Sequence, residues 1–131
     1  MNLVTVANMV STIKNGLLVG AKQVFVRKSR LTLGILKALK LDGYIEGYSE
    51  NSEKPYYATA LLKYDAKGLP VIRDIWVVSK GSRTVNVGAK EFKTREQYST
   101  LIVSTSKLGV VSHIDARREN TGGIVLCEVT S

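Results

Sequence analysis

A run of hydroxyl side chains, followed by a cation and a glycine, lies in the C-terminal third of the chain: Ser104, Thr105, Ser106, Lys107 and Gly109. Hydroxyls donate and accept hydrogen bonds to phosphate, sugar and base edges, and lysine adds a positive charge. Gly109 allows a sharp turn or the close approach of a ligand. Apolar, β-rich runs at 101–103 and 124–129 flank this polar loop. We therefore expect a rigid binding edge held by strands rather than a catalytic cleft.

Residue types that could support catalysis give a weaker pattern. Ser104 and Lys107 have the Ser-x-x-Lys spacing of serine hydrolases with a lysine base, but the accompanying Ser-Asp-Asn and Lys-Thr-Gly motifs are absent. Cys127 lies in an apolar run, so we expect it in the core. His113 is expected on the surface at a helix start, with no nucleophile paired to it. One His and one Cys cannot build a Cys/His zinc site, and we expect no metal and no cofactor.

Cations also gather in the first third of the chain, at Lys14 beside Asn15 and at Arg27, Lys28 and Arg30. Arg27, Lys28 and Arg30 surround a helix N-terminus, where positive charge opposes the helix dipole, and a bound anion would remove that conflict. The alternative is an ordinary exposed basic turn. Lys14 has its own alternative role, because a cation near a helix C-terminus complements the dipole.

Composition favours a polyanionic partner. The 131 residues carry 19 Lys and Arg against 11 Asp and Glu, a formal net charge of +8, which suits nucleic acid, although a merely basic soluble protein is the alternative. Hydrophobic residues make up 44% of the chain, enough for a packed core. The single cysteine excludes an intramolecular disulfide and fits a reducing compartment. No apolar run approaches the roughly 18 residues of a membrane span, and no secretory signal is recognisable.

Periodicity predicts the elements of the N-terminal half. Apolar residues at helical spacing predict a helix over 1–18, and a second helix after Ser29 that ends near Gly43. Strands are expected at 23–26, 44–50, 56–64 and 71–78, with turns at 51–55 and 65–68. A short β–α–β unit that continues into an antiparallel meander is typical of an α+β fold. Tyr44 and Trp76 are expected in the core, since both lie in apolar strands.

The C-terminal half reads as strands with one short helix. Residues 79–83 form a turn, and the mixed charges of 91–98 indicate a short helical connection. Ser112 is a plausible N-cap for a helix over 113–120, with Asp115 in its first turn and Arg117 and Arg118 in its last, which matches the dipole. The sequence thus predicts an α+β protein of two small lobes. The first, 1–79, is α-β-α-β-β(-β), and the second, 80–131, is mostly β with a short helix.

The order of several motifs resembles the small-subunit ribosomal protein eight family of bacterial and organellar type. Its C-terminal signature is Ser-Thr-Ser-Lys-Gly, then Asp, Ala-Arg and Gly-Gly. Here the matching residues are Ser104-Thr105-Ser106-Lys107-Leu108-Gly109, Asp115-Ala116-Arg117 and Gly122-Gly123. Further matches are Lys14-Asn15-Gly16, the Gly-Tyr-Ile-Glu within 36–48, and the Ser79 to Arg83 turn. Three features depart from the family: Leu108 is inserted, the turn lacks its proline, and Val85 replaces a tyrosine that can stack on a base.

The resemblance implies a structural, non-enzymatic protein of the small ribosomal subunit that binds the central domain of its rRNA and helps assembly. Its partners would be that rRNA and neighbouring small-subunit proteins, with no small-molecule substrate. The main contacts would come from Ser104, Thr105, Ser106, Lys107 and Gly109. Secondary candidates are Arg83, Arg117, Gly122 and Gly123. In the N-terminal lobe, a second phosphate-contacting surface would comprise Lys14, Asn15, Lys28 and Arg30.

Two alternatives to this function stay open. One is a free-standing basic nucleic-acid-binding regulatory protein that reuses the fold, and the other is a small hydrolase built on Ser104 and Lys107. Co-sedimentation with small subunits and labelling by a serine-reactive probe distinguish them. The three departures from the family pattern favour an organellar ribosome, so we expect the mitochondrial matrix rather than the bacterial cytoplasm.

Overall fold

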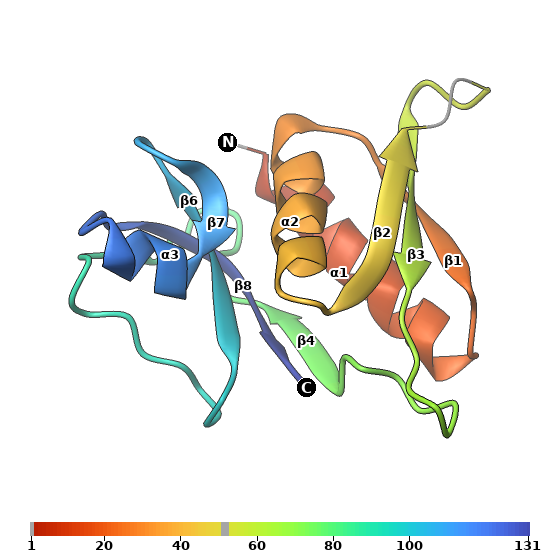
Figure 1. Ribbon diagram of the computed structural model, residues 1–131. Helices are drawn as coiled ribbons and strands as arrows, with labels where there is room; N and C mark the ends of the chain where they lie inside the picture. Colours follow the sequence, from red (N-terminus) through yellow and green to blue (C-terminus); the bar gives the residue numbers. More distant parts are fainter. Residues whose placement is uncertain (1, 51–52) are drawn as a thin grey trace.

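The computed structural model describes residues 2–50 and 53–131, which form an α+β protein with two antiparallel sheets (Figure 1). The helices are α1 (Leu3–Leu18), α2 (Arg30–Leu41) and α3 (His113–Arg118). The first sheet contains β1 (Gln23–Arg27), β2 (Ile45–Glu50) and β3 (Tyr57–Leu62). The second contains β4 (Asp74–Val77), β5 (Asn86–Val87), β6 (Thr100–Thr105), β7 (Gly109–Ser112) and β8 (Gly123–Thr130). This arrangement confirms the predicted fold class.

The two long helices begin and end where the sequence predicts. Ser29 and Thr32 form a capping box at α2, in which each hydroxyl accepts from the other residue's backbone N–H, at 3.1 and 2.8 Å. Asn2 caps α1 through its side-chain oxygen, which accepts from Val4 N–H at 3.1 Å. Gly43 follows α2 with φ +77°, a conformation that favours glycine after a helix.

The first sheet has the strand order β1-β3-β2. Alternate residues of its strands, including Val24, Val26, Ala58 and Ala60, are buried, so one face packs against α1 and α2 as a period-2 pattern requires. In this strand order, β3 is the central strand, and β1 and β2 occupy its two edges. The prediction that 71–78 extends this meander is wrong: β4 pairs with β8 in the second sheet.

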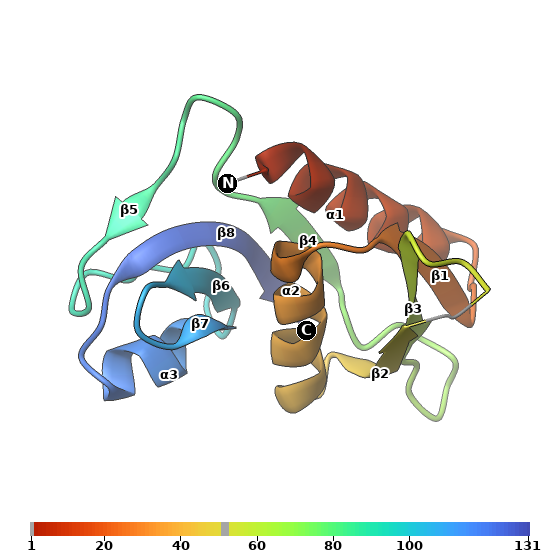
Figure 2. The same ribbon diagram turned by 90° about the horizontal axis from the view of Figure 1, so that it is seen from above.

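The helices α1 and α2 lie between the two sheets (Figures 1 and 2). One apolar core joins helical residues such as Met9 and Ile35 to Ile75, Leu126 and Cys127 of the second sheet. A smaller cluster lies beneath α3 and contains Phe92, Leu101, Val103, Ala116 and Val125. The division at 79/80 stays a prediction, and a continuous core crosses it.

The connection 91–98 contains no helix, contrary to the prediction. Its backbone N–H groups at Arg95 and Glu96 donate to the buried Glu128 carboxylate of β8, at 2.8 and 3.3 Å. In a helix these N–H groups would donate to carbonyl oxygens four residues earlier. Here the Glu128 side chain of β8 is the acceptor instead. Phe92 anchors the same segment in the smaller core cluster. The expected turn at 51–55 includes residues 51 and 52, which lie outside the described residues.

Three single-residue predictions have different outcomes. Tyr44 is buried, and its hydroxyl hydrogen-bonds that of Thr100 at 2.8 Å. Trp76 is only half-buried and lies under the Arg95 guanidinium, 5.1 Å from the ring centroid. His113 is buried, not exposed, because its Nδ1 accepts from Leu101 N–H at 3.0 Å.

None of the described helices is long and apolar enough to cross a membrane.

Candidate nucleic-acid interface

The hydroxyl run and its lysine form the tip of the β6–β7 hairpin. Thr105 pairs with Gly109, which has φ +76°, so residues 106–108 make a three-residue turn with a left-handed glycine behind it. The Thr105 hydroxyl donates to the Gly109 carbonyl at 2.8 Å and accepts from Leu108 N–H at 2.9 Å. The extra residue Leu108 is thus accommodated within a hydrogen-bonded turn. Ser106 and Lys107 are exposed at its tip.

Four of the predicted residues line one hollow of about 460 Å³ beside this hairpin: Ser104, Ser106, Gly122 and Gly123. The two glycines are required by close strand packing. A Cβ on Gly122 would overlap the carbonyl oxygen of Val87, and one on Gly123 would overlap that of Ser104. Because neither glycine has a side chain, β5 and β6 can both pack closely against β8 beside the hollow. Backbone groups of the glycines are therefore exposed to the hollow.

Sequence reasoning missed the third side of this hollow. Asn86, Val87 and Gly88 line it with the hydroxyls of Ser104 and Ser106. Asn86 is exposed, and its amide carries both donors and an acceptor. No spacing or motif in the sequence distinguishes Asn86, because β5 has only two residues and its place is fixed by pairing with Ile124 of β8.

Neither secondary arginine, Arg83 or Arg117, is among the described residues that line the hollow. Arg83 is exposed in a turn closed by backbone hydrogen bonds with Lys80, three residues before β5. Arg117 lies in the last turn of α3, and its Nη2 donates to the Phe92 carbonyl at 3.3 Å. Arg117 therefore fastens the 91–98 connection in addition to presenting positive charge.

The four N-terminal candidates do not form one surface. Lys14 and Asn15 lie near the end of α1, where Lys14 pairs with Asp74 at 3.4 Å. Arg30 lies with Asn2 at the other end of α1, about 18 Å away at the rise of a helix. Lys28 pairs with Glu50 at 3.1 Å, which offsets part of the charge around the α2 N-terminus. These cations form two separate groups.

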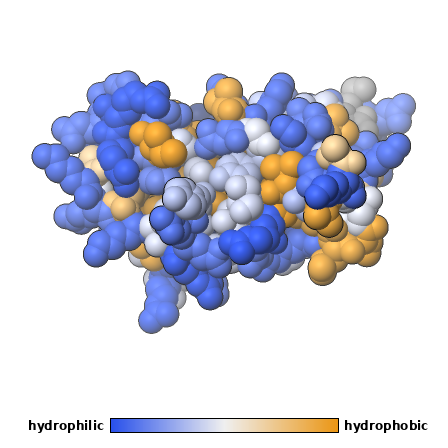
Figure 3. All heavy atoms as spheres, turned by 60° about the horizontal axis from the view of Figure 1, so that its bottom comes forward, coloured by the Kyte–Doolittle hydropathy of each residue, from blue (hydrophilic) through white to orange (hydrophobic). Residues whose placement is uncertain are grey.

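The charge of the hairpin surface is uncompensated. Within the described chain, no carboxylate pairs with Lys107 or Arg83, whereas Lys14 and Lys28 each have an acidic partner. The face drawn in Figure 3, seen from below Figure 1, is mostly hydrophilic, with separate hydrophobic groups at its left, its top and its right-hand end. An exposed, unpaired cation beside hydroxyls is suited to phosphate and sugar contacts.

The reactive residue types are placed for structure. Burial raises the pKa of the Cys127 thiol to about 12, so the thiolate nucleophile is scarce at neutral pH. No hydrogen bond among the described residues joins Ser104 to Lys107, as a lysine-base hydrolase would require. In residues 2–50 and 53–131, no three His, Cys, Asp or Glu side chains gather to hold a metal.

Comparison with known proteins gives relatives over almost the whole chain. The family model described as "Ribosomal protein S8" matches residues 4–130. "Small ribosomal subunit protein uS8" of Paracoccus denitrificans is 42% identical over 125 residues, 93% of each chain. The protein of the same name from Erythrobacter litoralis is 40% identical over 124 residues, again 93% of each. That of Ruegeria pomeroyi is 39% identical over 127 residues, 95% of this chain and 96% of the relative.

These relatives are bacterial and are named as ribosomal proteins, and they give no support to a mitochondrial location. The match spans both sheets, and it includes the hairpin with its inserted Leu108 and the departure at Val85, just before β5. With its α+β architecture and Ser-Thr-Ser-Lys hairpin, the chain belongs to the ribosomal protein S8 family of the small subunit.

Proposed function

We propose that the protein is a structural constituent of the small ribosomal subunit that binds the central domain of small-subunit rRNA and helps it fold during assembly. The observation that carries this proposal is the β6–β7 hairpin, where Lys107 is exposed beside the hollow lined by Ser104 and Ser106. Family membership supports the ribosomal setting. Neighbouring small-subunit proteins would be its other partners, and its role requires no catalysis.

Each side chain has a distinct role in this proposal. Lys107 contacts phosphate, and Ser104 and Ser106 exchange hydrogen bonds with sugar and base edges. Thr105 and Gly109 hold the turn, and through it the position of Lys107. RNA helices present phosphates and 2′-hydroxyls, and their bases become readable where the helix is irregular. A rigid hydroxyl-bearing tip therefore suits an irregular helix rather than a uniform duplex.

The other predicted residues extend this contact. Gly122, Gly123 and Asn86 line the same hollow as Ser104 and Ser106, and Arg83 and Arg117 add phosphate contacts from the C-terminal lobe. In the N-terminal half we propose two separate phosphate contacts. One is at Lys28 and Arg30, and the other is at Lys14 and Asn15.

The test is binding of the purified protein to a central-domain rRNA fragment over a salt series. Lys107→Ala should flatten the slope of log K against log salt by about one unit, since one phosphate contact is lost. The Ser104→Ala/Ser106→Ala pair should instead reduce the preference for the fragment over random RNA, at about 1–3 kcal/mol for lost base-edge contacts. Lys67→Ala, an exposed cation in the turn before Gly68, is the matched control.

Wild type that binds the fragment no better than random RNA would contradict the ribosomal proposal and favour a free-standing nucleic-acid-binding regulator. Co-sedimentation with small subunits in moderate salt gives a second, independent readout. The mitochondrial matrix stays a prediction from the inserted Leu108, the missing proline of the 79–83 turn and Val85 at the tyrosine position, and cell fractionation of the source organism would decide it.

A further inference from the structure

The outer face of the first sheet carries aromatic side chains that the core does not use. Val24, Val26, Ala58 and Ala60 point toward α1 and α2 and are buried. Residues between them point the opposite way, since side chains alternate along a strand. Because the two helices lie on the inner face (Figures 1 and 2), no described element covers the outer one.

Each of these aromatic rings has a cation above it. Phe25 and Tyr57 are each 39% exposed, and Tyr56 is 68% exposed. Lys54 Nζ lies 4.2 Å from the Phe25 ring centroid, and Arg27 Cζ lies 5.8 Å from that of Tyr56 and 6.0 Å from that of Tyr57. These distances are within cation–π range. Together Phe25, Lys54, Tyr56 and Tyr57 line a hollow of about 450 Å³.

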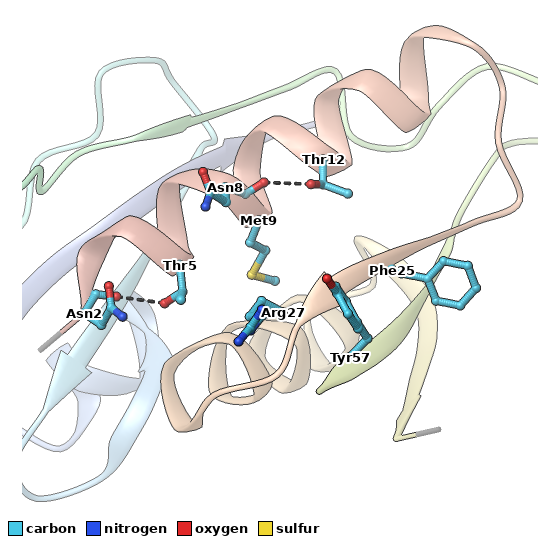
Figure 4. A pocket seen from close by; sticks show the side chains of 8 residues that line it. All are labelled: Asn2, Thr5, Asn8, Met9, Thr12, Phe25, Arg27 and Tyr57. Atoms are coloured by element: carbon cyan, nitrogen blue, oxygen red, sulfur yellow. Dashed lines mark hydrogen bonds between the residues drawn. The ribbon is translucent and has the colours of Figure 1, made fainter. Parts of the chain in front are cut away.

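A second hollow, of about 460 Å³, continues from the first because Phe25 and Tyr57 line both. Asn8 and Met9 of α1 also line this second hollow, which therefore extends from the outer face around the edge strand β1 to α1 (Figure 4). The Thr5 and Thr12 hydroxyls donate to carbonyls of their own helix, at 2.9 and 2.8 Å. The exposed Asn8 carboxamide makes no hydrogen bond within the described residues and is left for a ligand. The strip thus combines ring faces, cations and a free amide.

The chemistry of this strip selects an anionic partner with flat rings. Among the residues that the structure describes, no Asp or Glu lines either hollow, and no Leu, Ile or Val does so. Leu61 of β3, 40% exposed, adds an aliphatic side chain to this face outside the two hollows, so an apolar helix or strand of another protein would find few aliphatic contacts within them. Unpaired nucleotides offer both a π face for each ring and a phosphate for each cation. The net charge of +8 adds to the attraction.

We propose that this strip, on the face of the molecule turned away from the C-terminal sheet, binds an unpaired stretch of RNA. Bases stack on Phe25 and Tyr57, with Tyr56 at the exposed end, and Arg27 and Lys54 contact phosphates. Asn8 offers a hydrogen bond to a base edge. The proposal rests on the proposed function only in its partner class, RNA, and uses no residue of the β6–β7 hairpin.

The experiment measures binding of a fluorescent, unstructured ten-nucleotide oligouridine to the full chain. Phe25→Leu/Tyr57→Leu keeps apolar volume but removes the π faces, and should weaken binding by roughly tenfold or more for each stacked base lost. Arg27→Gln should reduce the salt slope by about 0.7. Tyr98→Leu, which removes an 84% exposed ring from the 91–98 connection, is the matched control and should bind like wild type. Melting temperatures verify that each variant is folded.

The two surfaces are separable in this assay. Lys107→Ala should leave oligouridine binding unchanged while it alters binding of the central-domain fragment. Wild type that fails to bind oligouridine but binds the fragment overturns this inference and leaves the proposed function standing. If the leucine pair does not weaken oligouridine binding yet abolishes co-sedimentation with small subunits, the strip is a protein-contact surface and the RNA assignment fails.

Discussion

His113 is a buried acceptor behind the hairpin. Its Nδ1 receives the Leu101 N–H of β6, and the Phe92 ring lies edge-on with ring centroids 6.1 Å apart. Burial, and then the positive charge of Arg117, lower the pKa of His113 below its ordinary value. A proton on Nδ1 would replace the acceptor with a donor that faces the Leu101 N–H. His113 therefore holds the start of α3 against β6 only while it is neutral.

This environment predicts an acid-dependent loss of stability. Because the folded pKa lies below the unfolded value of about 6.5, the unfolded chain binds more protons between the two pKa values. The free energy of unfolding should be retained above pH 6.5 and fall as the pH drops from there toward the folded pKa. His113→Asn, which offers a non-titrating oxygen near the Nδ1 position, should lose less between pH 7.5 and 5.5. Urea midpoints at both pH values measure this, and equal losses for both proteins would refute the assignment.

At the residue scale, the sequence predicted the cluster of hydroxyl side chains but not which of them are available to a ligand and which bond within the turn. Strand alternation turns Thr105 of β6 away from the side of Ser104, and Ser106, the first residue of the turn, lines the hollow together with Ser104. Thr105 is buried and bonds within the turn, whereas Ser106 is exposed. The hydroxyl chemistry is the same in all three, so residue type alone could not separate them. Asn86 was missed for the converse reason, since only strand pairing brings it to the hollow.

The connection 91–98 shows how one side chain can fix an irregular element. Glu128 is 2% exposed, and its carboxylate accepts hydrogen bonds from the N–H groups of Arg95 and Glu96. Arg73 forms an ion pair with Glu96 from the other side, and Arg117 donates to the Phe92 carbonyl. The segment is thus fastened to β8, α3 and the residue before β4. Its mixed charge resembles a solvated helix, but its backbone hydrogen bonds are made to other elements.

Removal of this acceptor should loosen the connection. Glu128→Ala leaves two partly buried N–H groups without a partner and should lower the free energy of unfolding by about 1–3 kcal/mol. Glu128→Gln retains one carbonyl oxygen and should lose less. Amide hydrogen exchange at Arg95 and Glu96 should accelerate more in the alanine variant than in the glutamine variant. Glu91→Ala, an exposed carboxylate of the same segment, is the control, and equal exchange in all three variants would contradict the role of Glu128.

At the element scale, local signals succeeded where an element is fixed by its own residues. Ser29 and Gly43 delimit α2, and Ser112 caps α3 through its hydroxyl, as predicted. The sheet assignment of β4 failed, because strand pairing depends on which edges are free. The central strand β3 has both neighbours already, and β8 offers an open edge to residues Asp74–Val77. The residues of β4 themselves do not indicate which sheet edge is free to pair with them.

At the scale of the molecule, the layer of α1 and α2 joins the two sheets. Gly34 of α2 lies directly against β7, where a Cβ would lie 2.7 Å from that of Val110. The apolar core likewise continues from Met9 and Ile35 to Ile75 and Cys127. Shared packing of this kind couples the halves energetically. The hairpin surface and the aromatic strip on opposite sides of the helix layer are therefore held by one core.

Because the two halves share this core, we expect the protein to unfold in one transition. Circular dichroism at 222 nm reports mainly α1 and α2, whereas fluorescence of the single Trp76 reports β4 in the second sheet. Both should give the same urea midpoint. Gly34→Ala forces α2 and β7 apart, so it should lower both midpoints together and reduce the free energy of unfolding by about 1–3 kcal/mol. Gly47→Ala is the control, because no atom lies within 4 Å of the added Cβ, and it should lower the midpoints less. Separate midpoints would mean that the two halves unfold independently, in which case the division at 79/80 describes real folding units and the shared core contributes little to their coupling.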